Sequence, residues 1–390
     1  MKGLKDEICP IHRLSPNDGK HYFYGYYDNP PFLPDGESHL CHRVDFMNRL
    51  HTAEDVCTLG VLRGGQFEPF AETKAWNFQQ GAMLQVLGGS SRVLYNCFED
   101  GAYRACIHDL HSGSRRLLPM PAANVSRDGK WAISINFSRI FNFRPGYGYA
   151  CMPDPWMHVN APEDDGVFVI NLETGECRLV LSYAQIAQLF AGTDPEMLHA
   201  KLVINHITFN PSASRFMFQV RNFPPKGKIH WTGVATADRD GQNLYQLMEF
   251  SPCSSHYAWR DDEHILMYVE CHATQDVRSM ALLTDRVPEV QVYDPARYNQ
   301  DIHCYYSPDL SYFSGDGYPD EEGYRPAFLH AGDKEWLLFR AWSSTESLYD
   351  WRCDLHMRWR PDGKARSFDS THEGFRGVYL ADLTELMKGR

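Results

Sequence analysis

A repeating turn signal divides this chain into units of similar length, and this repeat constrains the fold more than any other feature. Each signal is a short run rich in Pro, Asp, Gly or Ser, and the runs lie at Pro34–Gly36, Gly88–Gly89, Arg127–Gly129, Pro211–Ser214, Asp261–Asp262, Pro308–Asp309 and Pro361–Gly363. Most intervals are about 40 to 55 residues, close to the ~40–50 residues of a propeller blade. Seven turn units predict an all-β, seven-bladed β-propeller.

Strand-like runs flank these turns at Ser91–Asn96, Lys130–Ile135, Gly166–Asn171 and Gly377–Ala381. We expect Asn171–Glu176 to be a hairpin between two outer strands of one blade. Because the repeat runs from end to end, we expect a single propeller domain over residues 1–390. The alternative architecture is a β-sandwich or a pair of stacked sheets.

Helical signals are confined to two stretches, which we expect to be short insertions. Ser182–Phe190 begins with a serine suited to an N-cap and has apolar residues at helical spacing, and Pro195–Leu202 follows it. The segment Asn136–Tyr149 is expected to be a loop that interrupts a blade. Loops on one face of a propeller commonly carry its binding residues.

Composition limits the classes of partner. The formal net charge of −12 argues against a nucleic-acid binder, which should be basic, but local fields still permit an anionic substrate. The 11 cysteines are odd in number and show no close pairing, the first residues are polar, and no apolar run approaches the length of a membrane span. We therefore expect a cytoplasmic protein without a membrane partner.

Four histidines share one register in four successive units. His206, His256, His303 and His356 each lie five residues before the Pro or Asp that opens a turn. If the units surround an axis, these imidazoles converge to form a metal site, a proton-transfer site or both. The alternative is that each histidine only hydrogen-bonds a neighbouring blade.

Other candidate residues lie in the insertion and at one strand end. Arg144, Tyr147 and Tyr149 are set among glycines in the segment Asn136–Tyr149; Arg suits a carboxylate, and Tyr can transfer protons or stack on a sugar. Arg221 ends the strand after the His206 turn and is a candidate anion clamp. The alternatives are a packing role for the tyrosines and a surface ion pair for Arg221.

The motif Trp76–Gly81 is a further candidate for substrate binding. Trp76 and Gln80 precede the Gly88 turn in a register similar to that of the histidines. Their side chains either face the same site or tie blades together. The sequence contains no Gly-x-Ser-x-Gly elbow, no P-loop and no dinucleotide fingerprint.

Several short motifs resemble two families of seven-bladed polysaccharide lyases. The motifs that resemble the oligogalacturonate lyases are Cys353–Gly363, Phe368–Gly374, Ser255–Trp259 and His303 with Gly315–Tyr318. The motifs that are more similar to the ulvan lyases are Arg144–Tyr149 and Phe218–Arg221. The resemblance implies a metal held by neighbouring histidines in the last blade. This chain departs from that pattern, because Asp354 stands where a second histidine is expected.

The resemblance implies β-elimination of an anionic, uronate-containing oligosaccharide. In this interpretation His206 is the base or acid, Tyr147 is its proton partner, and Arg221 neutralises the substrate carboxylate. Arg144, Tyr149, Gln80 and Trp76 would bind substrate.

The implied cofactor is a divalent metal, Mn²⁺ or Zn²⁺, held by His256, His303 and His356. The alternative for His256 is a catalytic role. Two other functions remain open: a propeller that binds a glycan or a protein without catalysis, and a glycoside hydrolase with two carboxylates. An unsaturated, ultraviolet-absorbing product would distinguish elimination from both.

Overall fold

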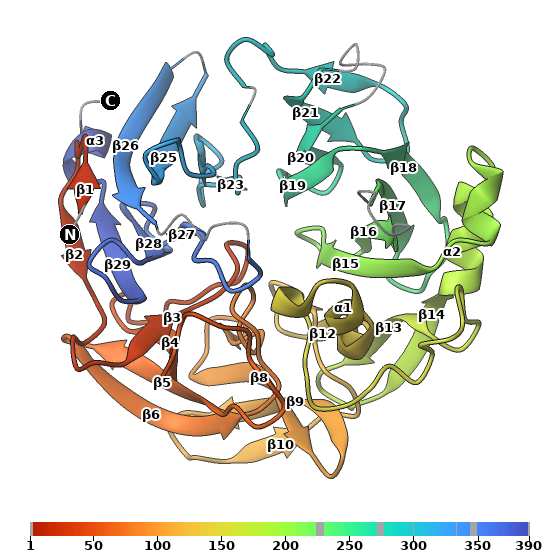
Figure 1. Ribbon diagram of the computed structural model, residues 1–390, viewed down its shortest axis with the longest axis horizontal. Coiled ribbons are helices and arrows are strands. Elements are labelled where there is room, and N and C mark those ends of the chain that lie inside the picture. Colours follow the sequence, from red (N-terminus) through yellow and green to blue (C-terminus); the bar gives the residue numbers. More distant parts are fainter. Residues whose placement is uncertain are drawn as a thin grey trace. The chain divides into compact units, whose positions relative to one another are not determined.

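The computed structural model describes residues 3–223, 230–270, 277–298, 300–332, 334–343 and 349–388. Among these residues the strands form seven antiparallel sheets, six of four strands and one of five. The succession of sheets along the chain is that of a seven-bladed β-propeller, so the predicted fold class is confirmed (Figure 1).

The chain divides into two compact units. The first unit comprises residues 1–98, 106–116 and 302–390, and the second comprises 99–105 and 117–301. One sheet has residues in both: β7 (Gln85–Val86), β8 (Arg92–Glu99), β9 (Ala102–Asp109) and β10 (Arg115–Leu117). The organisation as a single domain stays a prediction.

The first unit contains three complete sheets. One sheet consists of β3 (His21–Phe23), β4 (His39–Val44), β5 (Cys57–Arg63) and β6 (Gln66–Thr73). The second consists of β23 (Tyr305–Tyr306), β24 (Phe313–Asp316), β25 (Tyr324–Ala331), β26 (Lys334–Trp342) and β1 (Leu4–Lys5). The third consists of β27 (Arg358–Trp359), β28 (Ala365–Ser370), β29 (Gly377–Asp382) and β2 (Ile11–Arg13). The last sheet joins both ends of the chain, because β2 pairs antiparallel with β29.

The second unit also contains three complete sheets. They consist of β11 (Asn124–Val125), β12 (Trp131–Ser134), β13 (Gly166–Asn171) and β14 (Cys177–Ser182); of β15 (Leu202–Phe209), β16 (Arg215–Asn222), β17 (Thr232–Asp238) and β18 (Tyr245–Ser251); and of β19 (Ser254–Trp259), β20 (His264–Val269), β21 (Ser279–Thr284) and β22 (Val290–Val292). The predicted hairpin at Asn171–Glu176 joins β13 to β14 and is confirmed.

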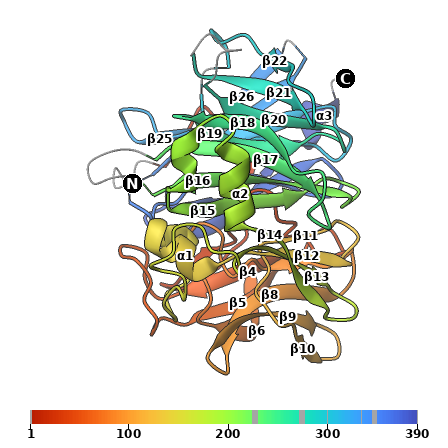
Figure 2. The same cartoon turned by 90° about the vertical axis from the view of Figure 1, so that its right-hand side faces the viewer.

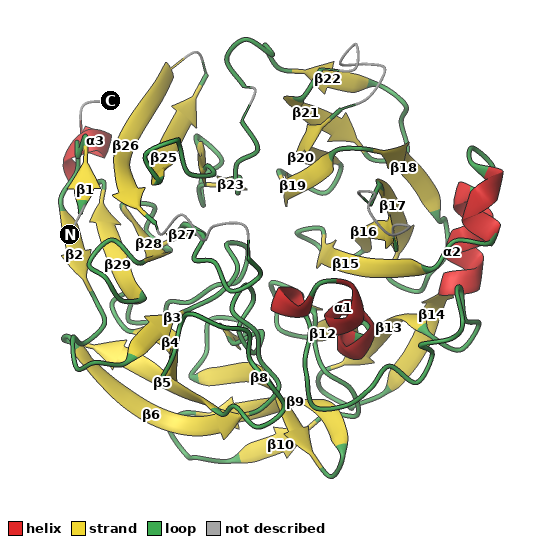
Figure 3. Ribbon diagram, viewed as in Figure 1, coloured by secondary structure: helices red, strands yellow, loops and turns green. Residues whose placement is uncertain are grey.

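The helices are short and few (Figure 3). Both predicted helical stretches are confirmed as α2 (Tyr183–Phe190) and the 3-10 helix η2 (Pro195–Leu198), and α2 lies against β14 and β18 (Figure 2). The Ser182 hydroxyl accepts from the Gln185 amide, and the Gln185 side chain accepts from the Ser182 amide, which is a capping box.

The expectation of helices only at those two stretches was wrong. The insertion after β12 forms α1 (Phe137–Phe143) and the 3-10 helix η1 (Pro145–Tyr147), and α3 (Thr384–Lys388) follows β29. The Asn136 side chain accepts from the Arg139 amide at 2.9 Å and begins α1. Among the described residues, no helix combines the length and apolar character that a membrane crossing requires.

Candidate functional site

The four repeated histidines lie in, or two residues before, the first strand of their sheets. His206 lies in β15 and His256 in β19, both in the second unit; His303 and His356 each lie two residues before β23 and β27, in the first unit. Each unit therefore holds one pair of these histidines. The convergence of all four stays a prediction.

In the first unit His303 and His356 lie together with Asp354. The ligand atoms of the three residues are all within 4.8 Å of one another, and all three side chains are buried. The two imidazole rings are perpendicular, with centroids 4.4 Å apart. We call this group the histidine–aspartate cluster.

The orientation of His303 is fixed by a carboxylate. Its Nδ1 donates to Asp316 Oδ2 at 2.9 Å, while Asp316 Oδ1 accepts from the Met357 amide at 3.2 Å. Burial favours protonation of Asp316, but the nearby His303 outweighs it and lowers the carboxyl pKa. A histidine that binds a metal commonly donates its other ring nitrogen to a carboxylate in this way.

His356 is suited to donate a lone pair. Burial, together with the neighbouring His303, lowers its pKa well below the usual value, so the ring is neutral at neutral pH. Its Nε2 is buried and accepts no hydrogen bond from the described residues. A buried, neutral and unbonded imidazole nitrogen fits a metal ligand.

Asp354 is ionised and held by two buried arginines. Arg325 Nη2 lies 2.8 Å from Asp354 Oδ1, and Arg352 Nε lies 2.8 Å from Oδ2. Burial would raise the carboxyl pKa, but Arg352 and Arg325 outweigh it and lower the pKa well below its usual range. Two imidazoles and one carboxylate fit a divalent cation. The two arginines partly neutralise the negative charge that Asp354 presents to such a cation.

Sequence analysis did not find the residues that surround this cluster. The ring of Tyr26 lies 4.9 Å from that of His356, and the ring of Tyr27 lies 5.5 Å from that of His303. The pair follows β3 as Gly25-Tyr-Tyr. That signal is weak, because one aromatic pair in a chain with 13% aromatic residues indicates no particular contact.

The motif Trp76–Gly81 contacts the segment that leads to Asp354. Gln79 Nε2 donates to the carbonyl of Arg352 at 2.9 Å. Trp76 is fully buried, and its indole donates to the Asp55 carbonyl. The backbone amide of Gln80 donates to Asn77 Oδ1 at 2.7 Å. The structure thus places Trp76 in the core, and the contact to the cluster segment is made by Gln79.

In the second unit, the insertion brings Tyr147 to His206. Their rings are perpendicular with centroids 5.6 Å apart, and the Tyr257 ring lies 5.9 Å from that of His206. The Arg144 guanidinium lies over the Tyr147 ring, 4.4 Å from its centroid. Tyr147 lies in η1, and Arg144 is the residue between the end of α1 and the start of η1. The folded insertion therefore fixes the side chains of Arg144 and Tyr147.

Arg221 also belongs to this group of the second unit. It lies in β16, paired with Val203 and Thr232, and is buried. Burial, together with the charges of Arg221 and Arg144, lowers the pKa of His230 to about 3. Arg144 lies over Tyr147, Tyr147 contacts His206, and Arg221 lies on the strand that pairs with the strand of His206. We call these four residues the arginine–histidine cluster.

His256 is paired with a carboxylate. Its Nδ1 donates to Asp301 Oδ1 at 2.8 Å, and the Ser255 hydroxyl donates to Asp301 Oδ2 at 2.8 Å. A His–Asp pair of this kind fixes the tautomer of a general base. The described residues that could hold a metal are those of the histidine–aspartate cluster, and His256 is outside it.

Irregular pairing in the first strands positions both histidines of the second unit. The register between β15 and β16 shifts between Ile204 and His206, and that between β19 and β20 shifts between Ser254 and Tyr257. Bulges of this kind re-aim side chains and are common beside active sites.

Tyr149 is packed inside the insertion. Its ring stacks on Phe137 with centroids 4.2 Å apart and meets Tyr103 edge-on at 5.2 Å. The side chain is fully buried. These contacts give Tyr149 a packing role, and its predicted role in substrate binding stays untested.

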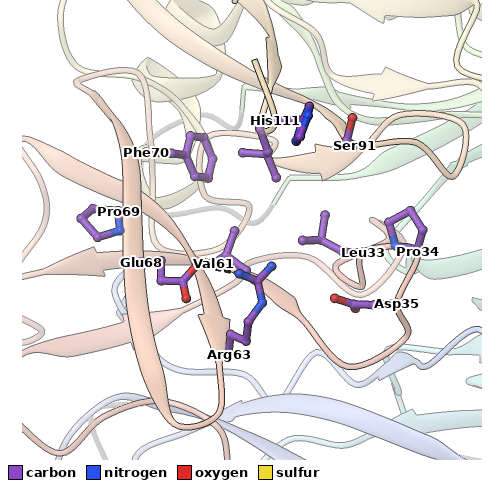
Figure 4. A pocket seen from close by; sticks show the side chains of 11 residues that line it. Leu33, Pro34, Asp35, Val61, Arg63, Glu68, Pro69, Phe70, Ser91 and His111 are labelled. Carbon is purple, nitrogen blue, oxygen red and sulfur yellow. Dashed lines mark hydrogen bonds and ion pairs between the residues drawn. The ribbon is translucent and has the colours of Figure 1, made fainter. Parts of the chain in front are cut away.

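A pocket of about 430 Å³ opens on the outer part of the first unit (Figure 4). Its lining includes Leu33, Val61, Phe70 and the ion pair between Arg63 and Glu68. It shares no residue with the histidine–aspartate cluster. The ion-pair side chains are about half exposed, so the pocket offers little enclosure for a reaction.

Comparison with solved structures supports the fold. A protein described as oligogalacturonate lyase in complex with manganese is 15% identical, with a TM-score of 0.66 over 98% of this chain and 95% of that one. The oligogalacturonate lyase from Vibrio parahaemolyticus is 16% identical, with a TM-score of 0.65 over 98% of each chain.

The β-propeller domain of the Trilobed protease from Pyrococcus furiosus is 10% identical, with a TM-score of 0.53 over 92% of this chain and 96% of that one. No protein-family model and no curated protein sequence matches the chain. At these identities the likeness shows the fold: this chain has the β-propeller architecture seen in the oligogalacturonate lyases.

Proposed function

We propose that this protein is a lyase that cleaves uronate-containing oligosaccharides by β-elimination. The observation that carries the proposal is the arginine–histidine cluster, which combines two guanidinium groups with an imidazole and a phenol. These are the groups that the reaction needs, and the fold is one that lyases of this kind use.

The reaction requires removal of a weakly acidic proton. The base takes the proton from the carbon next to the uronate carboxylate, a carbon–carbon double bond forms, and the carbon–oxygen bond to the departing sugar breaks. Negative charge develops on the carboxylate, so a fixed cation stabilises the transition state. Protonation of the departing oxygen completes the reaction.

We assign Arg221 to the substrate carboxylate, with Arg144 beside it. A planar guanidinium can hold a carboxylate through two hydrogen bonds. His206 and Tyr147 are the proposed proton-transfer pair, because their rings are in contact and both side-chain types can act as general acids or bases.

His256 is the second candidate for the base. Its contact with Asp301 favours a catalytic role over metal ligation. Replacement of His206 and of His256 by Ala separates the two assignments: the residue that is the base should lower turnover roughly 10²–10⁴-fold.

We further propose that the histidine–aspartate cluster holds Mn²⁺ or Zn²⁺ through His303, Asp354 and His356. Such a cation would supply positive charge toward an anionic substrate. The orientation of His303 by Asp316 and the unbonded Nε2 of His356 support this assignment.

The test is a screen of uronate polysaccharides and their short oligosaccharides, followed by near-ultraviolet absorbance. Elimination leaves an unsaturated uronate that absorbs, whereas hydrolysis releases reducing ends without absorbance. Reducing ends without the chromophore would favour a glycoside hydrolase, and binding without either product would favour a non-catalytic propeller. Tyr147→Phe keeps the ring and removes only the hydroxyl, so it tests proton transfer separately from stacking.

A further inference from the structure

Two aromatic rings form a flat platform in the first unit. Tyr349 and Trp351 are stacked with centroids 4.4 Å apart and an angle of 1° between the ring planes. Tyr349 is 51% exposed, whereas Trp351 is half-buried and packs against the core cluster that contains Trp76 and Phe78. The platform therefore has an anchored base and an exposed upper ring.

The backbone under the platform is held from two sides. Gln79 Nε2 donates to the carbonyls of Asp350 at 3.4 Å and Arg352 at 2.9 Å. Arg376 Nη2 donates to the carbonyls of Trp351 at 2.7 Å and Arg352 at 3.0 Å. A fixed segment loses little conformational freedom when a ligand binds, and this favours affinity.

The platform adjoins the histidine–aspartate cluster along the chain. Arg352, the residue after Trp351, pairs with Asp354. Tyr349 lies five residues before Asp354, and five residues span at most about 18 Å, so the exposed ring and the cluster are within reach of one short oligosaccharide. The anchored stack, the exposed ring and this proximity point to a ligand that extends from the cluster.

We propose that the Tyr349–Trp351 platform stacks against a sugar ring of the oligosaccharide, adjacent to the sugar that lies at the histidine–aspartate cluster. A pyranose ring presents an apolar C–H face, and the negative face of an aromatic ring attracts such hydrogens. The platform has only two rings and is far smaller than the roughly 800 Å² per partner of a stable protein interface. The proposal rests on the proposed function for the identity of the sugar.

The test measures affinity against chain length, using oligogalacturonates of two, three and four sugars. Tryptophan fluorescence gives Kd where the probe is not cleaved, and KM and kcat are measured where it is. Tyr349→Ala should weaken binding of the longer probes roughly tenfold by removing buried apolar contact. It should leave the disaccharide and kcat nearly unchanged.

Two variants control for the loss of a side chain. Tyr349→Phe keeps the ring and should retain wild-type affinity for every probe. Ile8→Ala removes an equally exposed apolar side chain of the first unit, 51% exposed, and should change no affinity.

The outcomes separate this proposal from the lyase assignment. Binding of the longer probes without cleavage, lost in Tyr349→Ala, supports the platform and overturns the lyase. Cleavage with the same KM in wild type and Tyr349→Ala at every length overturns the platform alone. If wild type binds none of the probes, the platform is overturned as well.

Discussion

His356 has a backbone conformation that few side chains adopt. Its φ is +43°, in the left-handed region, which costs on the order of 1–3 kcal/mol for a residue with a β-carbon. The neighbouring Asp316 accepts from the Met357 amide and so helps to hold this segment. Strain of this kind is commonly kept where it aims a functional side chain, which agrees with the proposed role of His356 as a ligand.

Replacement of His303 or His356 by Ala should abolish stoichiometric metal binding while the protein stays folded. Each variant removes one of three proposed ligands, and the two that remain bind too weakly to survive dialysis. Elemental analysis of dialysed protein after loading with Mn²⁺ or Zn²⁺ checks this. His264→Ala is the matched control, because His264 is paired with Asp261 outside the cluster. Metal retained in both ligand variants would contradict the assignment.

Arg221→Lys should lower turnover strongly on a confirmed uronate substrate, although the charge is kept. Lysine cannot reproduce the planar fork of guanidinium that holds a carboxylate through two hydrogen bonds. We expect a loss of roughly 10²–10³-fold, as for removal of a single transition-state donor, with little change in melting temperature. If Arg221→Ala keeps near wild-type kcat/KM, the neutralising role passes to Arg144.

At the scale of elements, the insertion after β12 positions half of the arginine–histidine cluster. Asn136 caps α1, Arg139 binds the Leu202 carbonyl at 2.6 Å, and η1 carries Tyr147. Because β15 begins at Leu202, the contact of Arg139 ties the insertion to the strand that bears His206. A loop expected from the sequence is thus a folded helical element with a defined neighbour.

Asn136→Ala should damage activity more than global stability. Loss of an N-cap costs about 1 kcal/mol, which loosens α1 and with it the position of Tyr147. We expect kcat to fall several-fold while the melting temperature changes by a few degrees. Asn136→Ser retains a capping oxygen but loses the hydrogen bonds that Asn136 Nδ2 donates to Asp154 and Asp165, so it should restore part of kcat. Equal losses in the Ala and Ser variants would show that capping is not the cause.

At the scale of the whole molecule, β2, the second strand along the chain, closes the last sheet. β2 supplies the outer strand next to β29, with Ile11 opposite Ala381. Without β2, the edge of β29 would expose unpaired backbone groups. Neither end of the chain alone can therefore complete this blade.

Removal of residues 1–13 should lower the melting temperature and promote aggregation. The cause is the newly exposed edge of β29, together with the edge of β26 that β1 covers. Thermal melts and light scattering measure both effects. A synthetic peptide of residues 8–15 should partly restore stability if strand pairing is responsible, and a scrambled peptide should not. An unchanged melting temperature in the truncated protein would contradict this role of β2.

Acid should destabilise the fold at pH values well above those at which carboxylates titrate. Burial lowers the pKa of His42 to about 3 and that of His39 well below its usual value, where Arg358 also contributes. The unfolded chain binds more protons than the folded one below pH ~6.5, so stability is present above that pH and is lost as pH falls.

Each of these buried histidines contributes a slope of up to about 1.4 kcal/mol per pH unit between pH ~6 and the folded-state pKa. Urea unfolding at pH 8, 6, 5 and 4 should therefore show a falling midpoint that begins between pH 7 and 6. A flat profile down to pH 4.5 would mean that these histidines are already protonated in the folded protein.

The sequence by itself determined the repeat, and with it the seven blades and the place of each histidine five residues before a turn. Turn residues and alternating strands are local signals, so they can be found from the sequence alone. Only the tertiary structure decided which side chains meet. The partners of His303 and His256, Asp316 and Asp301, are 13 and 45 residues away along the chain, and no local pattern fixes such distances.

The same limit explains the residues around the histidine–aspartate cluster. Arg325 lies in β25 and pairs with Asp354, which precedes the first strand of the following sheet. Gln79 binds Arg352 from 273 residues away. The capping of α1 by Asn136 was a local signal present in the sequence, whereas the contact of Tyr147 with His206 depends on how the helical insertion packs. Packing of distant segments, rather than local propensity, determines the chemistry that each cluster can perform.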